Sequence, residues 1–313
     1  MLIKKKIMSG ITNYNSSNCG SGVLGTGLPK CNIASWGLVN GIGLFEKGFT
    51  ADLSTFTKTI VENAIKSRKL HQAVGLFDFK QNNGKNGIAT SSSQIKVVTQ
   101  IGLPEFEFDF TKGGCFHKAL FSLQGQDRWD LVKYYPTGVL FFLNDDNTKL
   151  KGADAGMFSV ESMEEQNGNN PQKTTSMVQL TDANEYNTKF VFKTWAELGF
   201  NMAKLNGVID TDVTFAVAPT VGATTLQVKV QAGCNGSIIS QLDQVSNWGL
   251  VNLPSNEIIS VSVNLVTGVY TLTLDSALSS GDNPNVYLTD GTYAVAEDVN
   301  GGYYAGASSV ANL

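Results

Sequence analysis

Two residues that could carry out nucleophilic chemistry lie close together near the middle of the chain. Cys115 and His117 directly follow the glycine pair Gly113–Gly114 in the stretch FEFDFTKGGCFHKALFSLQGQ. A cysteine hydrolase needs a thiolate within hydrogen-bond reach of an imidazole, and usually a third group that orients the ring. The chain has 2 histidines in all, so partners for such a dyad are scarce.

The residues after the glycine pair have the spacing of a helix. Phe116, Ala119, Leu120 and Leu123 recur at i, i+3, i+4 and i+7, which predicts one apolar helix face. Side chains at i and i+2 of a helix diverge, so Cys115 and His117 would not face each other. We therefore interpret Gly113, Gly114, Cys115 and His117 as a corner between a strand and a short helix.

Metal and cofactor sites are not indicated by the other candidate ligands. The 4 cysteines, at positions 19, 31, 115 and 234, form no Cys-x-x-Cys pair and have no clustered histidines. The stretch NDDNTKLKGAD (144–154) offers hard oxygen donors, but it lacks the spacing and the final glutamate of an EF-hand, so a hairpin turn is favoured. No phosphate-binding glycine loop is present. We expect no catalytic, cofactor-binding or metal-binding residues and no enzymatic activity.

Composition excludes several classes of partner. The chain of 313 residues is 42% hydrophobic and 16% charged, which is typical of a globular protein. Its net charge is −4, and Arg68 and Arg128 are the only arginines, so specific nucleic-acid binding is not expected. No apolar run reaches the roughly 20 residues of a membrane span. The N-terminal lysines precede a polar segment, unlike a signal peptide, and Met1 and Met8 are both candidate starts.

Three regions are predicted along the chain. Residues 1–33 are rich in Gly, Ser and Asn and should form an extended arm, either a disordered terminus or a segment ordered against a neighbour. Residues 34–217 should form a strand-rich core with one long helix over 50–69 and the short helix after Gly114. Residues 218–313 hold short strands between turns, which predicts an immunoglobulin-like β-sandwich. The fold class is therefore mainly β.

One core strand, EFEFDF, alternates strictly. Its phenylalanines share one face, and Glu105, Glu107 and Asp109 share the other, which predicts a wet, acidic strand face.

Several segments together resemble virion structural proteins of tailed bacteriophages that infect Bacteroidetes. They include GTGLPKC, KGGCFHKAL, GVLFFLNDDNTKLKG, TSMVQLTDANEYN and NGVIDTDVTF, within residues 19–218. The order of elements is similar to that of phage tail-tube proteins, in which hexameric rings stack and an N-terminal arm or a long hairpin reaches the adjacent ring. The resemblance implies a virion protein, made in the host bacterial cytoplasm, that assembles with itself and with other virion proteins.

That resemblance assigns roles to two groups of residues. Cys19, Gly25, Gly27, Leu28 and Pro29 would belong to an assembly arm. Glu105, Glu107 and Asp109 would face the lumen of a tube and repel DNA phosphates. Head decoration, a connector ring or an auxiliary virion protein stays open as an alternative. In that alternative the terminal sandwich would bind a surface ligand or carbohydrate through Tyr287, Tyr293, Tyr303 and Tyr304.

Overall fold

The computed structural model describes residues 37–313, apart from 53–54, 91–93, 170, 254–255 and 312, together with the backbone of residues 19–24 and 28–31. The chain is mainly β, as the sequence predicts. It divides into two compact units, the second comprising residues 206–313 with 65–68. This boundary precedes the expected one at 217/218, because β16 (Val208–Phe215) pairs with strands of the second unit.

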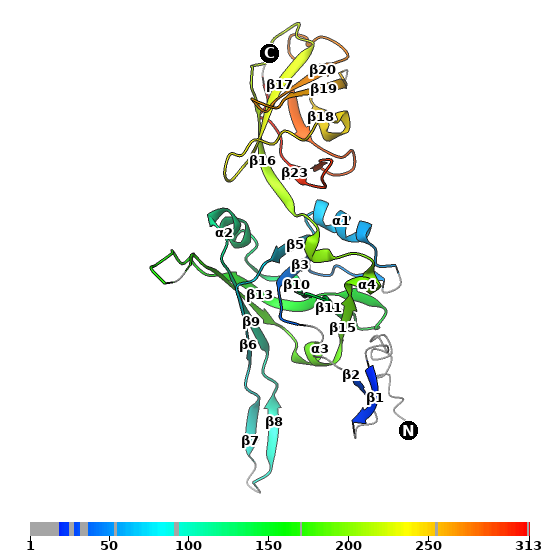
Figure 1. Ribbon diagram of the computed structural model, residues 1–313, viewed down its shortest axis with the longest axis vertical. Coiled ribbons are helices and arrows are strands. Elements are labelled where there is room, and N and C mark those ends of the chain that lie inside the picture. Colours follow the sequence, from blue (N-terminus) through cyan, green and yellow to red (C-terminus); the bar gives the residue numbers. More distant parts are fainter. Residues whose placement is uncertain are drawn as a thin grey trace. The chain divides into compact units, whose positions relative to one another are not determined.

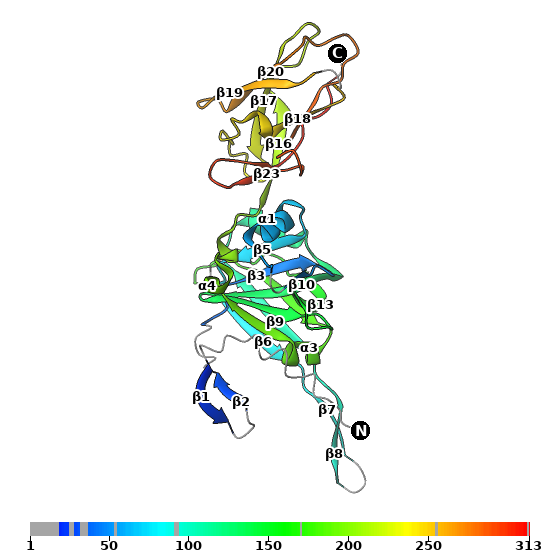
Figure 2. The same ribbon diagram turned by 90° about the vertical axis from the view of Figure 1, so that its right-hand side faces the viewer.

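An eleven-stranded, curled sheet forms the first unit (Figures 1 and 2). At its centre is β10 (Gly125–Tyr135), which pairs with β3 (Gly41–Glu46), β11 (Gly138–Leu143) and β13 (Ala153–Val160). The other strands are β4 (Ala51–Asp52), β5 (Leu70–Val74), β6 (Asp78–Asn83), β9 (Pro104–Phe110), β12 (Lys149–Lys151), β14 (Thr174–Leu180) and β15 (Phe190–Thr194). Fully buried Phe106, Phe108 and Phe110 belong to its core, as their alternation predicts.

Among the described residues, four short helices accompany this sheet: α1 (Lys58–Lys66), α2 (Gly114–Phe121), α3 (Ala183–Thr188) and α4 (Trp195–Leu198). The long helix predicted over 50–69 is wrong in extent. Ala51 and Asp52 form β4 and pair with β12, so the helix begins only at Lys58. Its buried face consists of Val61, Ala64 and Ile65. The short helix after the glycine pair is observed as α2, shifted slightly toward the N-terminus.

A two-stranded hairpin continues β6 and β9 away from the sheet. It consists of β7 (Gly87–Thr90) and β8 (Lys96–Gln100), which pair in an antiparallel manner. Both views show it extending well beyond the sheet from which it arises (Figures 1 and 2). We call residues 84–103 the ribbon.

The second unit contains a six-stranded sheet and a two-stranded one. The first has the order β19 (Ile258–Asn264), β20 (Val269–Leu274), β17 (Thr225–Ala232), β16, β23 (Tyr303–Ala305), β22 (Ala296–Glu297). The second pairs β18 (Trp248–Val251) with β21 (Asn285–Leu288). Their shared core is built around Trp248 and Tyr270, whose ring centroids are 4.9 Å apart.

The arm contains a small hairpin of its own. β1 (Cys19–Leu24) and β2 (Leu28–Cys31) pair in an antiparallel manner, with Cys19 opposite Cys31. Leu28 and Pro29 therefore lie in a strand, whereas Gly25 and Gly27 fall outside the described residues.

Candidate functional sites

The Cys115–His117 corner has the geometry of a structural turn. β9 ends at Phe110 and α2 begins at Gly114, with Gly113 as its N-cap. His117 Nδ1 lies 3.2 Å from the hydroxyl of Thr174 on β14. Cys115 is bonded in a disulfide, so it presents no free thiolate for nucleophilic attack.

The acidic row of β9 is not a free row of charges. Asp109 is only 4% exposed; its carboxylate accepts a hydrogen bond of 2.6 Å from the Thr175 hydroxyl and lies 3.4 Å from Lys173 Nζ. Glu107 is half-buried and pairs with Lys80 on β6. Glu105 is half-buried as well. The expectation of a wet face is wrong at Asp109, because this carboxylate is buried and contacts Thr175 and Lys173.

The stretch 144–154 forms a turn, then β12 and the start of β13. The side-chain oxygen of Asn144 accepts hydrogen bonds from the backbone N–H groups of Thr148 and Lys149, at 2.9 and 3.0 Å. Asp145 is paired with Lys189. Within the described part of the chain, no group of three or more His, Cys, Asp and Glu side chains could hold a metal ion. None of the described helices has the length and apolar character needed to cross a bilayer.

The ribbon exposes an unusual concentration of apolar side chains. Val97 and Val98 are 52% and 54% exposed, although adjacent residues of a strand point to opposite faces. Neither face of the ribbon is therefore covered. Ile88, Ile95 and Ile101 are also exposed. An exposed β-branched ribbon of this kind is a template for association with another chain.

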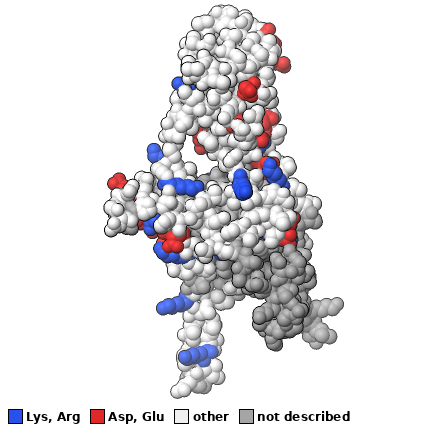
Figure 3. Space-filling model, viewed as in Figure 1, with Lys and Arg blue, Asp and Glu red and all other residues white. Residues whose placement is uncertain are grey.

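The ribbon also differs from the rest of the chain in charge. It contains Lys85 and Lys96 and no acidic residue. The view in Figure 3 shows basic side chains, and no Asp or Glu, along this projection. Since the whole chain carries −4 and the ribbon +2, the remaining residues carry −6.

The ladder between the strands is interrupted where the ribbon leaves the sheet. Residues 84–86 and 101–103 lie between the β6–β9 and β7–β8 pairings. Gly84 and Gly102 meet there: a Cβ added at Gly102 would lie 1.8 Å from the Gly84 carbonyl oxygen. Only glycine fits at position 102 without moving the opposite strand.

Strand β10 contains a buried lysine that packs against β9 and α3. Lys133 is 3% exposed, and its Nζ lies 4.2 Å from the ring centroid of Phe106 on β9 and 4.8 Å from that of Tyr186 on α3. It donates a 2.7 Å hydrogen bond to the Tyr186 hydroxyl. Burial lowers the pKa of Lys133 to about 7. The aromatic rings offset part of the cost of this buried cation.

The same strand buries a carboxylate. Asp130 is 2% exposed, accepts a hydrogen bond of 3.3 Å from the Gly48 N–H and lies opposite Asp154 of β13. Burial raises the pKa of Asp130 to about 7, although Lys151 acts in the opposite direction.

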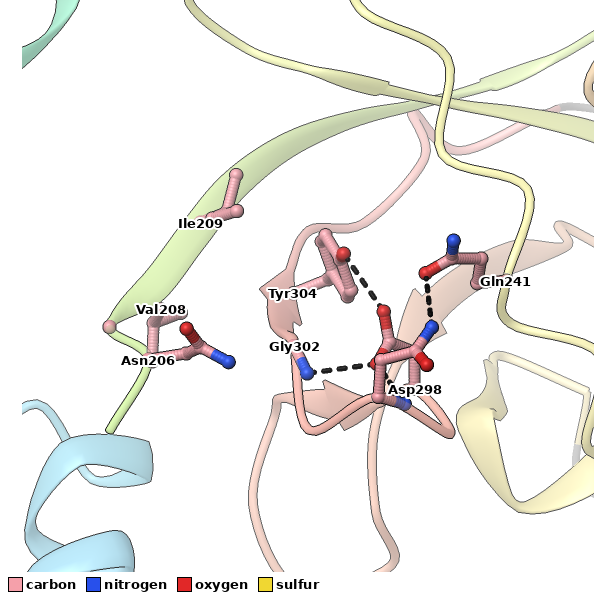
Figure 4. Close-up of a pocket in the computed structure, with 9 residues that line it drawn as sticks. Asn206, Val208, Ile209, Gln241, Asp298, Gly302 and Tyr304 are labelled. Atoms are coloured by element: carbon pink, nitrogen blue, oxygen red, sulfur yellow. Dashed lines mark hydrogen bonds between the residues drawn. The ribbon is translucent and has the colours of Figure 1, made fainter. Parts of the chain in front are cut away.

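The second unit contains a pocket of about 420 Å³ between the start of β16 and the loop that precedes β23 (Figure 4). Asn206, Ile209, Gln241, Asp298 and Tyr304 are among the residues that line it. Sequence reasoning missed this pocket, because its polar residues are widely separated in the chain and follow no motif.

The tyrosines proposed as a carbohydrate platform are not exposed. Tyr303 and Tyr304 are 3% and 8% exposed, and Tyr287 and Tyr293 are half-buried. Tyr304 contributes to the pocket through its hydroxyl group, which points toward Asp298 (Figure 4). The aromatic platform of that alternative is therefore not exposed at these positions, and these side chains mainly pack within the second unit.

The chain matches no protein-family model, and no curated protein sequence is significantly similar to it.

Proposed function

We propose that this chain is a non-enzymatic bacteriophage virion structural protein that self-assembles into rings and forms a tail tube for the passage of DNA. The virion assignment is supported by the sequence resemblance described above, whose most specific segment is KGGCFHKAL. Ring symmetry, hexameric in the proteins that it resembles, and contacts with other virion proteins belong to the same proposal.

The observation that carries self-assembly is the ribbon. A two-stranded ribbon is marginally stable by itself in water, and this one leaves five β-branched apolar side chains exposed: Ile88, Ile95, Val97, Val98 and Ile101. Burying one such side chain in an interface contributes about 1.5–3 kcal/mol. The ribbon is therefore better suited to an interface than to solvent.

A second copy of the chain is the occupant that the charges favour. The ribbon carries +2, and the remainder of each chain carries −6, so contacts between copies bring opposite charges together. In a ring or a stack of rings, each copy donates one ribbon and receives another, which leaves no ribbon exposed except at the ends.

The test is negative-stain electron microscopy of the purified protein over a concentration series. Wild type should form rings or hollow tubes. A variant with Val97→Glu and Val98→Glu should stay monomeric, because both side chains are exposed in the monomer and charged groups are costly in an apolar interface. The matched control carries Val217→Glu and Val221→Glu, which make the same change at two exposed valines outside the ribbon and leave the ribbon's charge unchanged.

Two outcomes would contradict the proposal. If the valine variant assembles as well as wild type, the ribbon does not carry self-assembly. If wild type stays monomeric at every concentration, a head-decoration or auxiliary role that needs a preformed partner replaces the tube. Assembly by the control together with failure of the valine variant supports the proposal.

A further inference from the structure

The one carboxylate that lines the pocket of the second unit accepts hydrogen bonds from the protein on both of its oxygens. Asp298 is 6% exposed. One carboxylate oxygen accepts hydrogen bonds from the Asn300 and Gly302 N–H groups, at 2.7 and 2.8 Å. The other accepts a hydrogen bond of 3.0 Å from the Tyr304 hydroxyl. Asp298 therefore shapes the loop and does not offer a free charge to a ligand.

The lining excludes ionic ligands. Its members are Asn206, Gly207, Val208, Ile209, Gln241, Asp298, Asn300, Gly302 and Tyr304, with no Lys, Arg or His among them. A phosphate or carboxylate ligand would find no cationic partner here. A metal ion would find only one carboxylate, and that group is already satisfied by donors.

Three side-chain amides remain as the recognition groups. The Asn206 amide donates to the Gly301 carbonyl at 2.9 Å, and the Asn300 amide donates to Gln241 Oε1 at 3.1 Å. These two hydrogen bonds fix the orientation of the amides. They use the Asn206 and Asn300 nitrogens and the Gln241 oxygen, and they do not use the Asn206 and Asn300 oxygens or the Gln241 nitrogen. Figure 4 shows Asn206 and Gln241 on opposite sides of the Asp298–Tyr304 pair. The pocket thus combines acceptors and donors without a net free charge.

An apolar flank completes the site. Ile209 is 43% exposed on β16, and Val208 beside it is half-buried. Oriented neutral amides next to an aliphatic surface match a ligand whose hydroxyl groups both donate and accept and whose ring carries C–H faces. A volume of about 420 Å³ is within the ordinary range for small-molecule sites.

We propose that this pocket binds a neutral saccharide. The inference is independent of self-assembly, since every lining residue belongs to the second unit and none belongs to the ribbon. Binding would give a virion protein a second role in contacting glycans, carried by oriented amides instead of by stacked tyrosines.

Saturation-transfer difference NMR on the full chain tests the proposal, with glucose, galactose, mannose and N-acetylglucosamine as probes at millimolar concentration. At least one probe should give a signal. A variant with Gln241→Ala and Asn300→Ala should weaken binding at least tenfold, the equivalent of about 1.4 kcal/mol. The control, Gln227→Ala with Asn235→Ala, removes one Gln and one Asn side chain at exposed positions outside the pocket. It should bind as wild type does.

Ile209→Ser provides a second variant in case the double substitution disturbs the loop. It removes the apolar flank from an exposed position and should weaken binding severalfold. The proposal is overturned if none of the four sugars gives a signal, or if both pocket variants bind as tightly as wild type. Electron microscopy of the same samples keeps this result separate from that of assembly, because the pocket variants leave the ribbon unchanged.

Discussion

Individual residues of β10 combine core packing with titration near neutral pH. Asp130 and Lys133 lie on the same strand, and both have a pKa of about 7. Burial moves the two values in opposite directions, because the charged form is disfavoured in each case. Both residues therefore cost stability over defined ranges of pH, which gives the first prediction.

Replacing Asp130 with Asn should stabilise the protein at alkaline pH. The folded-state pKa of Asp130 is raised, so its stabilising contribution is complete below the unfolded value of 3.8 and is lost as pH rises through about 7. The amide that replaces the carboxyl group does not titrate. The variant should match wild type near pH 4 and exceed it near pH 8 by up to roughly 4 kcal/mol, at about 1.4 kcal/mol per unit of pKa.

Urea unfolding at the two pH values measures this difference. Asp127→Asn is the matched control, since Asp127 is an exposed carboxylate of the same strand that pairs with Lys47. Loss of an exposed pair changes stability by about 0–1 kcal/mol. A variant gain that is equal at pH 4 and pH 8 would show that burial of the Asp130 charge does not control stability.

At the scale of elements, the close approach of the Gly84 and Gly102 backbones sets where the ribbon leaves the sheet. Gly102→Ala should redirect the ribbon, because the new Cβ collides with the backbone of the opposite strand. We expect loss of rings in electron microscopy while the thermal midpoint of the sheet changes little. Gly168→Ala is the control, since a Cβ there meets no atom within 4 Å. Normal assembly of the Gly102→Ala variant would mean that the close approach of Gly84 and Gly102 does not set the direction of the ribbon.

Strands with a regular apolar pattern were predictable from sequence, whereas the central strand β10 was not. EFEFDF and GVLFFL are observed as β9 and β11, because alternating or continuous apolar residues are a local signal. β10 has the sequence GQDRWDLVKYY, in which Asp130 and Lys133 occupy core positions. Only tertiary contacts make these positions tolerable. The central strand of the sheet therefore has a weaker sequence signal than its neighbours.

The two misplaced boundaries have a related cause. Residues 50–57 fit a helical period, but pairing with β12 makes Ala51 and Asp52 a strand. The motif QNNGKNG is rich in turn-forming residues, yet it spans the end of β6, the interruption and the start of β7. In both places the partner strand, distant in sequence, decides the local conformation. IKVVTQ is typical of a strand and is observed as β8, but no local signal showed that the ribbon would be exposed.

For the molecule as a whole, the division into two units separates the two proposed recognition surfaces. The ribbon belongs to the first unit, and the amide-lined pocket belongs to the second. The composition change near residue 217 pointed to a second domain, but it could not show that β16 already pairs with β17 and β23. The pocket was beyond sequence reasoning, because Asn206, Gln241 and Asn300 are far apart in the sequence and line one pocket only in the folded chain.

The exposed ribbon should make the protein's sensitivity to proteases depend on assembly. Lys85 and Lys96 are trypsin targets in a thin two-stranded segment, and such segments open locally at low free-energy cost. Free chains should be cut there first and chains in rings should be spared, which mass spectrometry of the two fractions after brief digestion would measure. Equal cleavage in both fractions would place the ribbon outside the interface. In a mixed population, proteolysis would thus remove the chains that failed to find a neighbour and leave finished particles intact.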